Sequence, residues 1–337
     1  MTQNLEKRCA ALLETLGIAS AHDIQSATPL TGGVASDIAV VKLADRAVCV
    51  KFALPKLRVA ADWFAPVHRN AAEYAWLEVA AQIAPESAVE VYGLSEDLHG
   101  FAMEFLEPAS NYLWKSALLR EDEDKGEAAK VGDLIGRIHQ VSAQPDFDSA
   151  YFQNRDDFRA LRIEPYLTYL QSIYPELDNQ LGSISNTLYE TSKVLIHGDV
   201  SPKNILFRSG SPIILDAECA TMGDACFDVS FSLNHLILKA VHLPKSRQRL
   251  LQDALKLWEA YSAYIDWESP EELESRICHL LPALMLARVD GKSPVEYLDE
   301  AHRVCVRQIS RPLIKHPKSS LFDLIATIRS DLQEIVI

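Results

Sequence analysis

The sequence predicts an α+β fold of two lobes: a small lobe built on an antiparallel sheet and a larger, mainly helical lobe. Strand-like runs separated by turns fill residues 24–53 and return at 87–106, with one helical segment between them. Beyond Pro108 most apolar residues recur at helical spacing. We place the boundary after residue 107, which gives lobes of 1–107 and 108–337, because the proline ends a strand and no periodic pattern continues through it.

The elements of both lobes are expected from local patterns. Residues 4–16 predict an amphipathic helix, DIAVVKL and AVCVKFA predict a hairpin, and a helix over 66–83 precedes two strands in SAVEVYGL and HGFAMEFL. In the large lobe the helical pattern is clearest in four segments, residues 126–141, 158–173, 248–264 and 273–289. Short strands in VLIHGD, NILFRS and PIILDAE interrupt these helices.

Composition and charge narrow the class of protein. The chain has 337 residues, is 48% hydrophobic and carries a formal net charge of −14, which repels nucleic acid backbones, so we expect no nucleic-acid partner. No apolar run approaches the roughly 18 to 20 residues that span a bilayer, and the first helix does not resemble a signal peptide. We therefore expect no membrane partner and a cytoplasmic location. The six cysteines include no CxxC pair, which favours reduced thiols over a zinc site.

Two loops between apolar strands carry acidic and amide side chains. In IHGDVSPKNIL, Asp199 stands where a strand ends and Asn204 follows five residues later. A carboxylate there can orient a hydroxyl and take its proton, and an amide oxygen suits a hard cation such as magnesium. In the second loop Asp216 ends the run PIIL, and Glu218, two residues on, can point the same way. Each motif alone is typical of a turn or a capped strand end, but together they predict a site for a metal and a phosphate.

The combination of HGDxxxxN, LDxE and GDxxFD resembles the aminoglycoside phosphotransferase and choline kinase family, the small-molecule branch of the protein-kinase-like fold. The resemblance implies transfer of the γ-phosphate of ATP, with Mg²⁺, to a hydroxyl of a small molecule such as a sugar or an amino alcohol. It assigns the catalytic roles to Asp199 as base and to Asn204 and Asp216 as metal ligands, with Glu218 as a further metal-binding acid. His197 and Gly198 would shape the first loop, and Asp228 would tie it down.

The same resemblance implies nucleotide-binding groups in the small lobe. Gly32 and Gly33 lie in the loop that would cover the phosphates, although a hairpin turn needs nothing more than two glycines. Lys51 would bind phosphate, and Glu73 in the next helix would pair with it. The alternative is that Lys51 reaches solvent along its own stem while Glu73 lies on the exposed face of its helix.

The segment MEFLE falls where the chain passes between the lobes. Its backbone groups would hydrogen-bond adenine, and we expect Met103, Glu104, Phe105 and Leu106 at the nucleotide site because of this position.

The acceptor is less well defined. The segment from Val50 to Leu77 is similar to methylthioribose kinases, but Ala287 precedes Arg288 where those enzymes carry paired arginines, so we expect a related enzyme with another hydroxylated metabolite. Aminoglycosides or choline would need an acidic or aromatic recess, which the acidic segment 264–276 offers, although SPEE within it is also an ordinary helix start. Further candidates for the acceptor pocket are Trp63, Trp114, Arg288 and Lys292.

Two rival functions use the same motifs. One is a non-catalytic, nucleotide-binding scaffold, and the other transfers AMP instead of phosphate, which would release pyrophosphate instead of ADP. The chain is expected to be a monomer or a homodimer.

Overall fold

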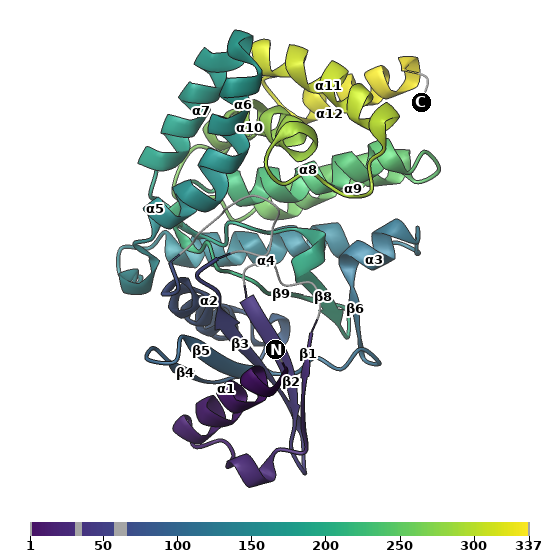
Figure 1. The fold of residues 1–337 in the computed structure, drawn as a ribbon. Coiled ribbons are helices and arrows are strands. Elements are labelled where there is room, and N and C mark those ends of the chain that lie inside the picture. Colours follow the sequence, from purple (N-terminus) through teal and green to yellow (C-terminus); the bar gives the residue numbers. More distant parts are fainter. Residues whose placement is uncertain (1, 31–35, 57–65, 336–337) are drawn as a thin grey trace.

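A computed structural model describes residues 2–30, 36–56 and 66–335, and it confirms the small antiparallel-sheet lobe and the larger helical lobe (Figure 1). Strand β5 (Gly100–Glu104) is the last strand that joins the sheet of the small lobe. The next strand, β6 (Asn111–Leu113), pairs with β8 of the helical lobe. The division of the chain at residue 107 stays a prediction.

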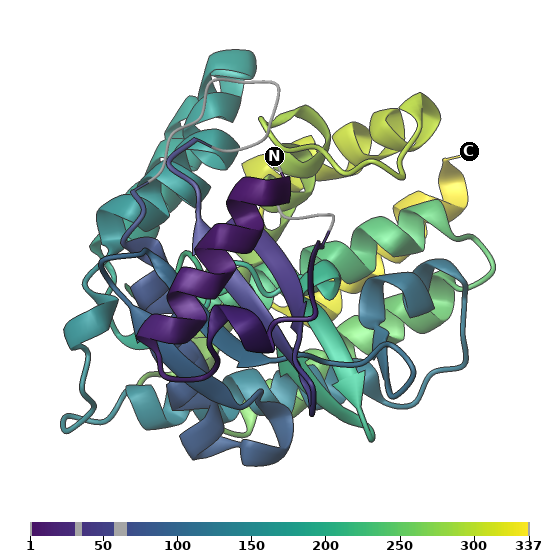
Figure 2. The same ribbon diagram turned by 60° about the horizontal axis from the view of Figure 1, so that its bottom comes forward.

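The small lobe is a five-stranded antiparallel sheet in the order β1-β2-β3-β5-β4. Its other strands are β1 (Ser26–Pro29), β2 (Ser36–Lys42), β3 (Ala47–Ala53) and β4 (Val91–Ser95). Helix α1 (Thr2–Thr15) covers the face turned away from the helical lobe, as Figure 2 shows, and α2 (Arg69–Ile83) packs on the other face. Both helices were expected from the sequence.

Strand β3 is buried along nearly its whole length because both helices pack on it. Alternate side chains of a strand point to opposite faces. Val48, Val50 and Phe52 accordingly join the apolar cluster under α1, whereas Cys49 joins the cluster on the side of α2. Lys51 shares the face of Cys49, and this register directs its ammonium group towards α2.

The helical lobe contains the four helices that the sequence predicts and several that it does not. The helices are α3 (Trp114–Leu119), α4 (Glu127–Ser142), α5 (Arg155–Phe158), α6 (Tyr169–Ile173), α7 (Asp178–Glu190), α8 (Cys226–His242), α9 (Arg247–Ser262), α10 (Pro270–Asp290), α11 (Glu300–Lys315) and α12 (Leu321–Glu334). Helix α8 is buried on nearly all sides, although its polar residues recur at helical spacing, so its polar face is also covered by the lobe.

The helix expected over residues 158–173 is present, but its central part is a π-helix. The segment η4 (Arg159–Thr168) joins α5 to α6 and contains Pro165. Proline has no N–H to donate and its ring crowds the preceding turn, and a wider turn accommodates both effects. The π-helix matters for the site because it carries Arg162 and Tyr166.

Two small sheets at the border of the lobes hold the motif loops (Figure 1). Strand β7 (Val194–Ile196) pairs with β10 (Thr221–Gly223), and β8 (Ile205–Arg208) pairs with both β6 and β9 (Ser211–Ile214). The loop from His197 to Asn204 leaves β7, and the loop with Asp216 and Glu218 leaves β9. Both loops therefore begin at buried strand ends, as expected.

All six cysteines are buried and free. Cys9 and Cys49 lie in the small lobe, and Cys219, Cys226, Cys278 and Cys305 lie in the helical lobe. Within the described part of the chain, no helix is long and apolar enough to cross a membrane.

Candidate active site

We call residues 197–204 the HGD loop. A buried carboxylate holds the backbone at the start of this loop in place. Asp228, at the start of α8, accepts hydrogen bonds from the N–H of His197 at 2.6 Å and from the N–H of Gly198 at 2.8 Å. Its side chain is 1% exposed, so both bonds are shielded from water. The tie that the sequence predicts between Asp228 and this loop is therefore present.

Gly198 and His197 give the loop its shape. Gly198 has a φ of +77°, and a Cβ at this position would lie 2.7 Å from the Cβ of Cys219, so only glycine fits. The imidazole of His197 accepts the N–H of Asp199 at Nδ1 over 3.1 Å and donates from Nε2 to the carbonyl of Leu215 over 3.2 Å. Burial lowers the pKa of His197, which keeps the ring in the neutral form that these bonds require.

Asp199 faces two cations. Its Oδ2 lies 3.1 Å from Nη2 of Arg162 and 3.1 Å from Nζ of Lys203. Burial raises the pKa of Asp199, but Lys203 and Arg162 lower it by more, so the group stays ionised at neutral pH. Sequence reasoning missed Arg162, because nothing in a helical pattern marks a residue 37 positions upstream as a partner of this carboxylate.

Asn204 is oriented by its own loop. Its Nδ2 donates to the carbonyl of Asp199 over 3.1 Å, and the residue is 8% exposed. Since the amide nitrogen is engaged, the amide oxygen is the group that remains for a cation.

Lys51 binds carboxylates from both lobes. Its Nζ lies 2.7 Å from Oε2 of Glu73 on α2, 2.5 Å from Oδ1 of Asp216 and 3.1 Å from Oε1 of Glu218. Burial lowers the pKa of Lys51, but Asp216, Glu218 and Glu73 raise it well above its usual value, so the ammonium is charged. The expected Lys51–Glu73 pair is thus present, and Lys51 is 2% exposed, which excludes the alternative of a solvent-directed lysine.

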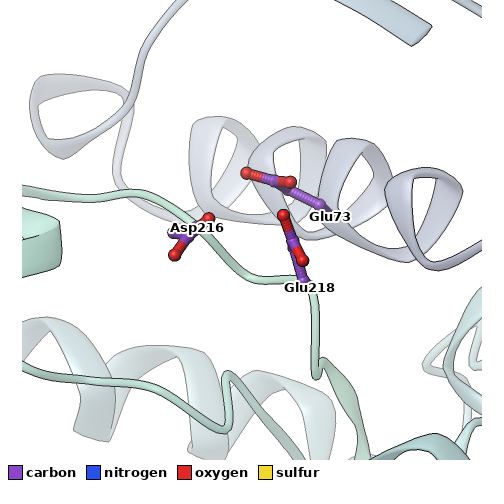
Figure 3. Close-up of side chains that lie close together, drawn as sticks. All are labelled: Glu73, Asp216 and Glu218. Atoms are coloured by element: carbon purple, nitrogen blue, oxygen red, sulfur yellow. The ribbon is translucent and has the colours of Figure 1, made fainter. Parts of the chain in front are cut away.

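The three carboxylates around Lys51 converge, as Figure 3 shows, with Glu73 on its helix opposite Asp216 and Glu218 on their loop. One ligand oxygen from each lies within 4.8 Å of the others. Glu218 uses both oxygens: Oε1 accepts from Ser36 and faces Lys51, and Oε2 lies 2.8 Å from Nε of Arg69. Arg69 was not predicted; it is 1% exposed at the start of α2 and connects the small lobe to this loop.

The donor set suits a divalent cation. The carboxyl groups of Glu73, Asp216 and Glu218 surround the ammonium of Lys51, and Arg69 pairs with Glu218. Burial raises the pKa of Glu73 to about 8, so Asp216 and Glu218 are the carboxylates that carry charge at neutral pH. Asp216 contacts Lys51 through Oδ1, and its side chain is 37% exposed. Its φ of +72° departs from the extended backbone of β9, so the chain turns at this residue. A second carboxylate oxygen and the amide oxygen of Asn204 are hard ligands of the kind that magnesium prefers. The residues present therefore fit the metal that the sequence implies.

The segment between the lobes is partly buried. Met103 and Leu106 are 6% and 8% exposed and belong to the main apolar core. The N–H of Glu104 donates to the carbonyl of Glu90 over 2.8 Å, and its carboxylate forms an ion pair with Arg208 at 2.8 Å. Phe105 packs partly buried against the same core. A place for adenine along this segment stays a prediction, and the N–H of Glu104 is already engaged.

Several other expected site residues lie elsewhere or outside the described residues. Gly32, Gly33 and Trp63 fall outside them. Trp114 is 2% exposed and packs against Phe207, and its place in the acceptor pocket stays a prediction. In the acidic segment Ser269 caps α10 through the N–H of Glu272, and Glu268 pairs with Arg276 at 2.8 Å, which favours the helix-start interpretation.

Comparison with known proteins agrees with this architecture. The model of the "phosphotransferase enzyme family" matches residues 26–273, so the chain belongs to this family. A methylthioribose kinase of Erwinia tasmaniensis is 23% identical over 250 residues, which cover 64% of this chain and 62% of that enzyme. The match thus spans less than two thirds of the length of this relative.

Two solved structures share the fold. A choline/ethanolamine kinase family protein of Mesorhizobium loti has a TM-score of 0.57 at 15% identity, covering 98% of this chain and 100% of that chain. The amicoumacin kinase hAmiN, solved with AMP-PNP, Ca²⁺ and Ami, also has a TM-score of 0.57 at 14% identity, covering 94% and 97%. The two-lobed, protein-kinase-like fold is therefore confirmed.

Proposed function

We propose that this enzyme transfers the γ-phosphoryl group of ATP to a hydroxyl of a small molecule. The observation that carries the proposal is that Lys51 of the small lobe meets Asp216 of the helical lobe at 2.5 Å. Membership of the phosphotransferase enzyme family supports the reaction class. The nucleotide bound to the kinase hAmiN supports ATP as the donor.

Lys51 holds the phosphates of the nucleotide. It is a charged donor in a water-poor site, and Glu73 keeps it directed towards the border of the lobes. Electrostatic interactions are stronger in such a site than in water. Binding of ATP therefore replaces part of the negative charge that Asp216 and Glu218 present to Lys51 in the free enzyme.

Asp199 orients the acceptor. In the reaction the hydroxyl oxygen forms a bond to the γ-phosphorus, the bond from that phosphorus to the β,γ-bridging oxygen breaks, and ADP leaves. The hydroxyl proton passes to the carboxylate of Asp199. Because Lys203 and Arg162 hold the pKa of Asp199 below its usual range despite burial, this carboxylate is a weak base. Its main contribution is positioning, and the proton moves late, when the attacking oxygen has become acidic.

Asn204 and Asp216 would hold magnesium, with Glu218 as the further candidate ligand predicted from the sequence. The metal would neutralise the charge on the phosphates. The Ca²⁺ in the hAmiN complex supports a divalent ion at such a site. Arg162 and Lys203 hold the Asp199 carboxylate in place during the transfer.

The acceptor is a small molecule bound against the helical lobe, and the relatives named above support this substrate class. A methylthioribose kinase and a choline/ethanolamine kinase family protein are among them, so a sugar and an amino alcohol are both represented. A cytoplasmic location and a monomeric or homodimeric state remain expectations.

The test is ADP release from Mg·ATP with a panel of hydroxylated metabolites, comparing the wild type with Asp199→Asn. We expect kcat to fall by about 10² to 10⁴ while nucleotide affinity changes less than about twofold. Asp133→Asn, on α4, is the matched control, since this half-exposed carboxylate bonds only to neighbouring side chains. Unchanged turnover in Asp199→Asn would overturn the assignment, and pyrophosphate in place of ADP would show AMP transfer.

A further inference from the structure

The helical lobe holds a group of basic side chains next to the HGD loop, and among the described residues a carboxylate pairs with one of them alone, Lys203 with Asp199. We call Lys203, His235, Lys239 and Arg288 the basic strip. They come from the HGD loop, from α8 and from α10. These four basic side chains come together in a chain whose formal net charge is −14.

Helix α8 presents two members of the strip on one face. Phe231, His235 and Lys239 follow one another at intervals of four residues, which places them on one face of the helix. The ring of His235 lies 5.2 Å from that of Phe231. The ammonium of Lys239 lies 5.0 Å from the centre of the Tyr297 ring, and it donates a long hydrogen bond, 3.4 Å, to the carbonyl of His235.

Helix α10 adds Arg288, which bonds to the same π-helix that carries Arg162. Its Nη1 donates to the hydroxyl of Tyr166 over 3.3 Å and also bonds to Ser293. Tyr166 lies one turn after Arg162 on the π-helix, and Arg162 contacts Asp199 at 3.1 Å. Lys203 reaches the same carboxylate directly at 3.1 Å and is 46% exposed. The strip therefore begins at the proposed acceptor-activating group and continues into the helical lobe.

The two most deeply placed cations of the strip lack a carboxylate partner, although both make hydrogen bonds. Lys239 is 1% and Arg288 8% exposed, and within the described part of the chain neither forms an ion pair with a carboxylate. Nε of Arg288 and Nε2 of His235 are buried without a hydrogen-bond partner. The nearby carboxylate of Glu296 is already paired with Lys115 and is 67% exposed. Buried cations without partners are costly, and an anionic ligand removes that cost.

The electrostatics agree with the geometry. Burial lowers the pKa of Lys239 to about 7, and Lys115 and Arg288 lower it while Glu296 raises it. Burial, together with Lys239, Arg288, Lys203 and Lys115, lowers the pKa of His235 well below its usual value. A cation entering this region would be repelled, whereas an anion would be attracted.

We propose that the basic strip binds an oxyanion group of the acceptor, a carboxylate or a phosphate ester, while a hydroxyl of the same molecule faces Asp199. This inference rests on the proposed function and names its substrate class: the acceptor is a hydroxylated anion, not a cationic amine such as choline or an aminoglycoside.

The first test measures anion binding independently of catalysis. Phosphate and malonate are titrated by calorimetry, at constant ionic strength in chloride, into protein saturated with Mg²⁺ and AMP-PNP, so that the nucleotide site is filled. We expect saturable binding in the wild type and at least a tenfold loss in Lys239→Met and in Arg288→Met. Lys7→Met, at an exposed position of α1, is the matched control and should bind like the wild type.

Lys239→Met keeps the test decisive if Arg288→Met fails to fold, because an unbranched apolar side chain suits the buried position. Equal affinity in the wild type and Lys239→Met, or no saturable binding in the wild type, would overturn the proposal.

The second test separates this proposal from the proposed function and distinguishes the two oxyanions. ADP release is measured with glycerol, glycerate, glycerol 3-phosphate and choline as probes. Greater stimulation by glycerate or by glycerol 3-phosphate than by glycerol, reduced in Lys239→Met, supports the proposal and identifies the preferred group. Greater stimulation by choline or glycerol overturns it and leaves the kinase function standing. If anions bind in a way that depends on Lys239, but no acceptor stimulates the release of ADP from ATP, the result supports anion binding by the basic strip and counts against the kinase function.

Discussion

Lys51 and Asp216 lie 2.5 Å apart, nitrogen to oxygen, although 165 positions separate them in the chain. The pair joins β3 of the small lobe to the loop after β9 of the helical lobe. Because all four groups lie close together in a largely buried cluster, the protonation of Lys51 and Asp216 is coupled to that of Glu73 and Glu218. A substitution of one carboxylate therefore changes the electrostatic environment in which Lys51 meets a nucleotide.

Asp216 and Glu218 should differ in their effect on metal and nucleotide binding. Asp216→Asn removes a proposed metal ligand, so we expect the affinity for Mg·ATP to fall by about tenfold or more, which is about 1.4 kcal/mol. Glu218 has both oxygens engaged by Ser36, Lys51 and Arg69, so Glu218→Gln should mainly lower stability. Calorimetric titration of each variant with Mg·ATP, and separately with Mg·ADP, measures the affinity, and denaturant unfolding measures the stability. An equal loss of metal-dependent affinity in both variants would make Glu218 a direct ligand as well.

Gly198→Ala should disrupt the HGD loop. The left-handed φ of +77° costs about 1 kcal/mol for alanine, and the Cβ would lie 2.7 Å from that of Cys219, which adds roughly 1 to 3 kcal/mol. Gly126→Ala is the matched control, because Gly126 has a φ of +78° and nothing within 4 Å of its Cβ position. Denaturant unfolding of both variants isolates the steric part. Equal destabilisation in the two would show that Cys219 moves aside freely.

Asp228→Asn should lower both stability and kcat. The carboxylate accepts two backbone N–H groups, and an amide in its place would turn a donor towards one of them, at a cost of roughly 1 to 3 kcal/mol. The HGD loop would then lose its fixed position, so kcat should fall more than the nucleotide KM rises. Asp290→Asn is the comparison, since Asp290 is bound by Arg307 and Tyr174 away from the loop. A loss of stability without a change in kcat for Asp228→Asn would limit its role to folding.

Lys239→Met should stabilise the protein in a pH-dependent way. The pKa of Lys239 is lowered by burial to about 7 in the folded state, against 10.5 in the unfolded state. The unfolded state therefore binds more protons between these values, so the destabilisation by Lys239 is complete below pH 7 and disappears towards pH 10.5. The gain from Lys239→Met should be on the order of a few kcal/mol at pH 6 and shrink by about 1.4 kcal/mol per pH unit above 7.

Unfolding in phosphate-free buffer from pH 6 to 9.5 measures this gain. The facing groups are Lys115, Arg288 and Glu296, with His235 and Tyr297 beside them. Lys7→Met should show no such slope. A gain for Lys239→Met that is constant with pH would mean that Lys239 is not titrating in this range.

The parts of this fold that follow from the sequence are those with a local pattern. The hairpin of β2 and β3, helices α1, α2, α4, α9 and α10, and the two loops with Asp199 and Asp216 each carry their signal within about twenty residues. The Lys51–Glu73 pair was predicted from the family resemblance, and the need of a buried lysine for a partner supports it.

What sequence reasoning missed depends on contacts between distant segments. Arg162 and Arg69 contact Asp199 and Glu218 across 37 and 149 positions, and neither has a local feature that marks it as part of a site. Helix α8 was not predicted, although polar residues from Asp228 to His242 recur on one of its faces at helical spacing; nearly all of that face is buried. Its two buried basic residues, His235 and Lys239, flank the apolar residues 236–238, and that mismatch, together with Arg288 as a candidate for the acceptor pocket, was the available signal for the basic strip.

Because all six thiols are buried, their rates of chemical modification measure how often the surrounding segments open. A thiol reagent can modify a buried cysteine only when the surrounding segment opens, so the rate at each position reports the free energy of that opening. Two of the cysteines belong to the sheet lobe and four to the helical lobe. Mass spectrometry of the labelled protein would therefore read the opening of each lobe separately, and protection of Cys49 by nucleotide would report occupancy beside Lys51 without any engineered probe.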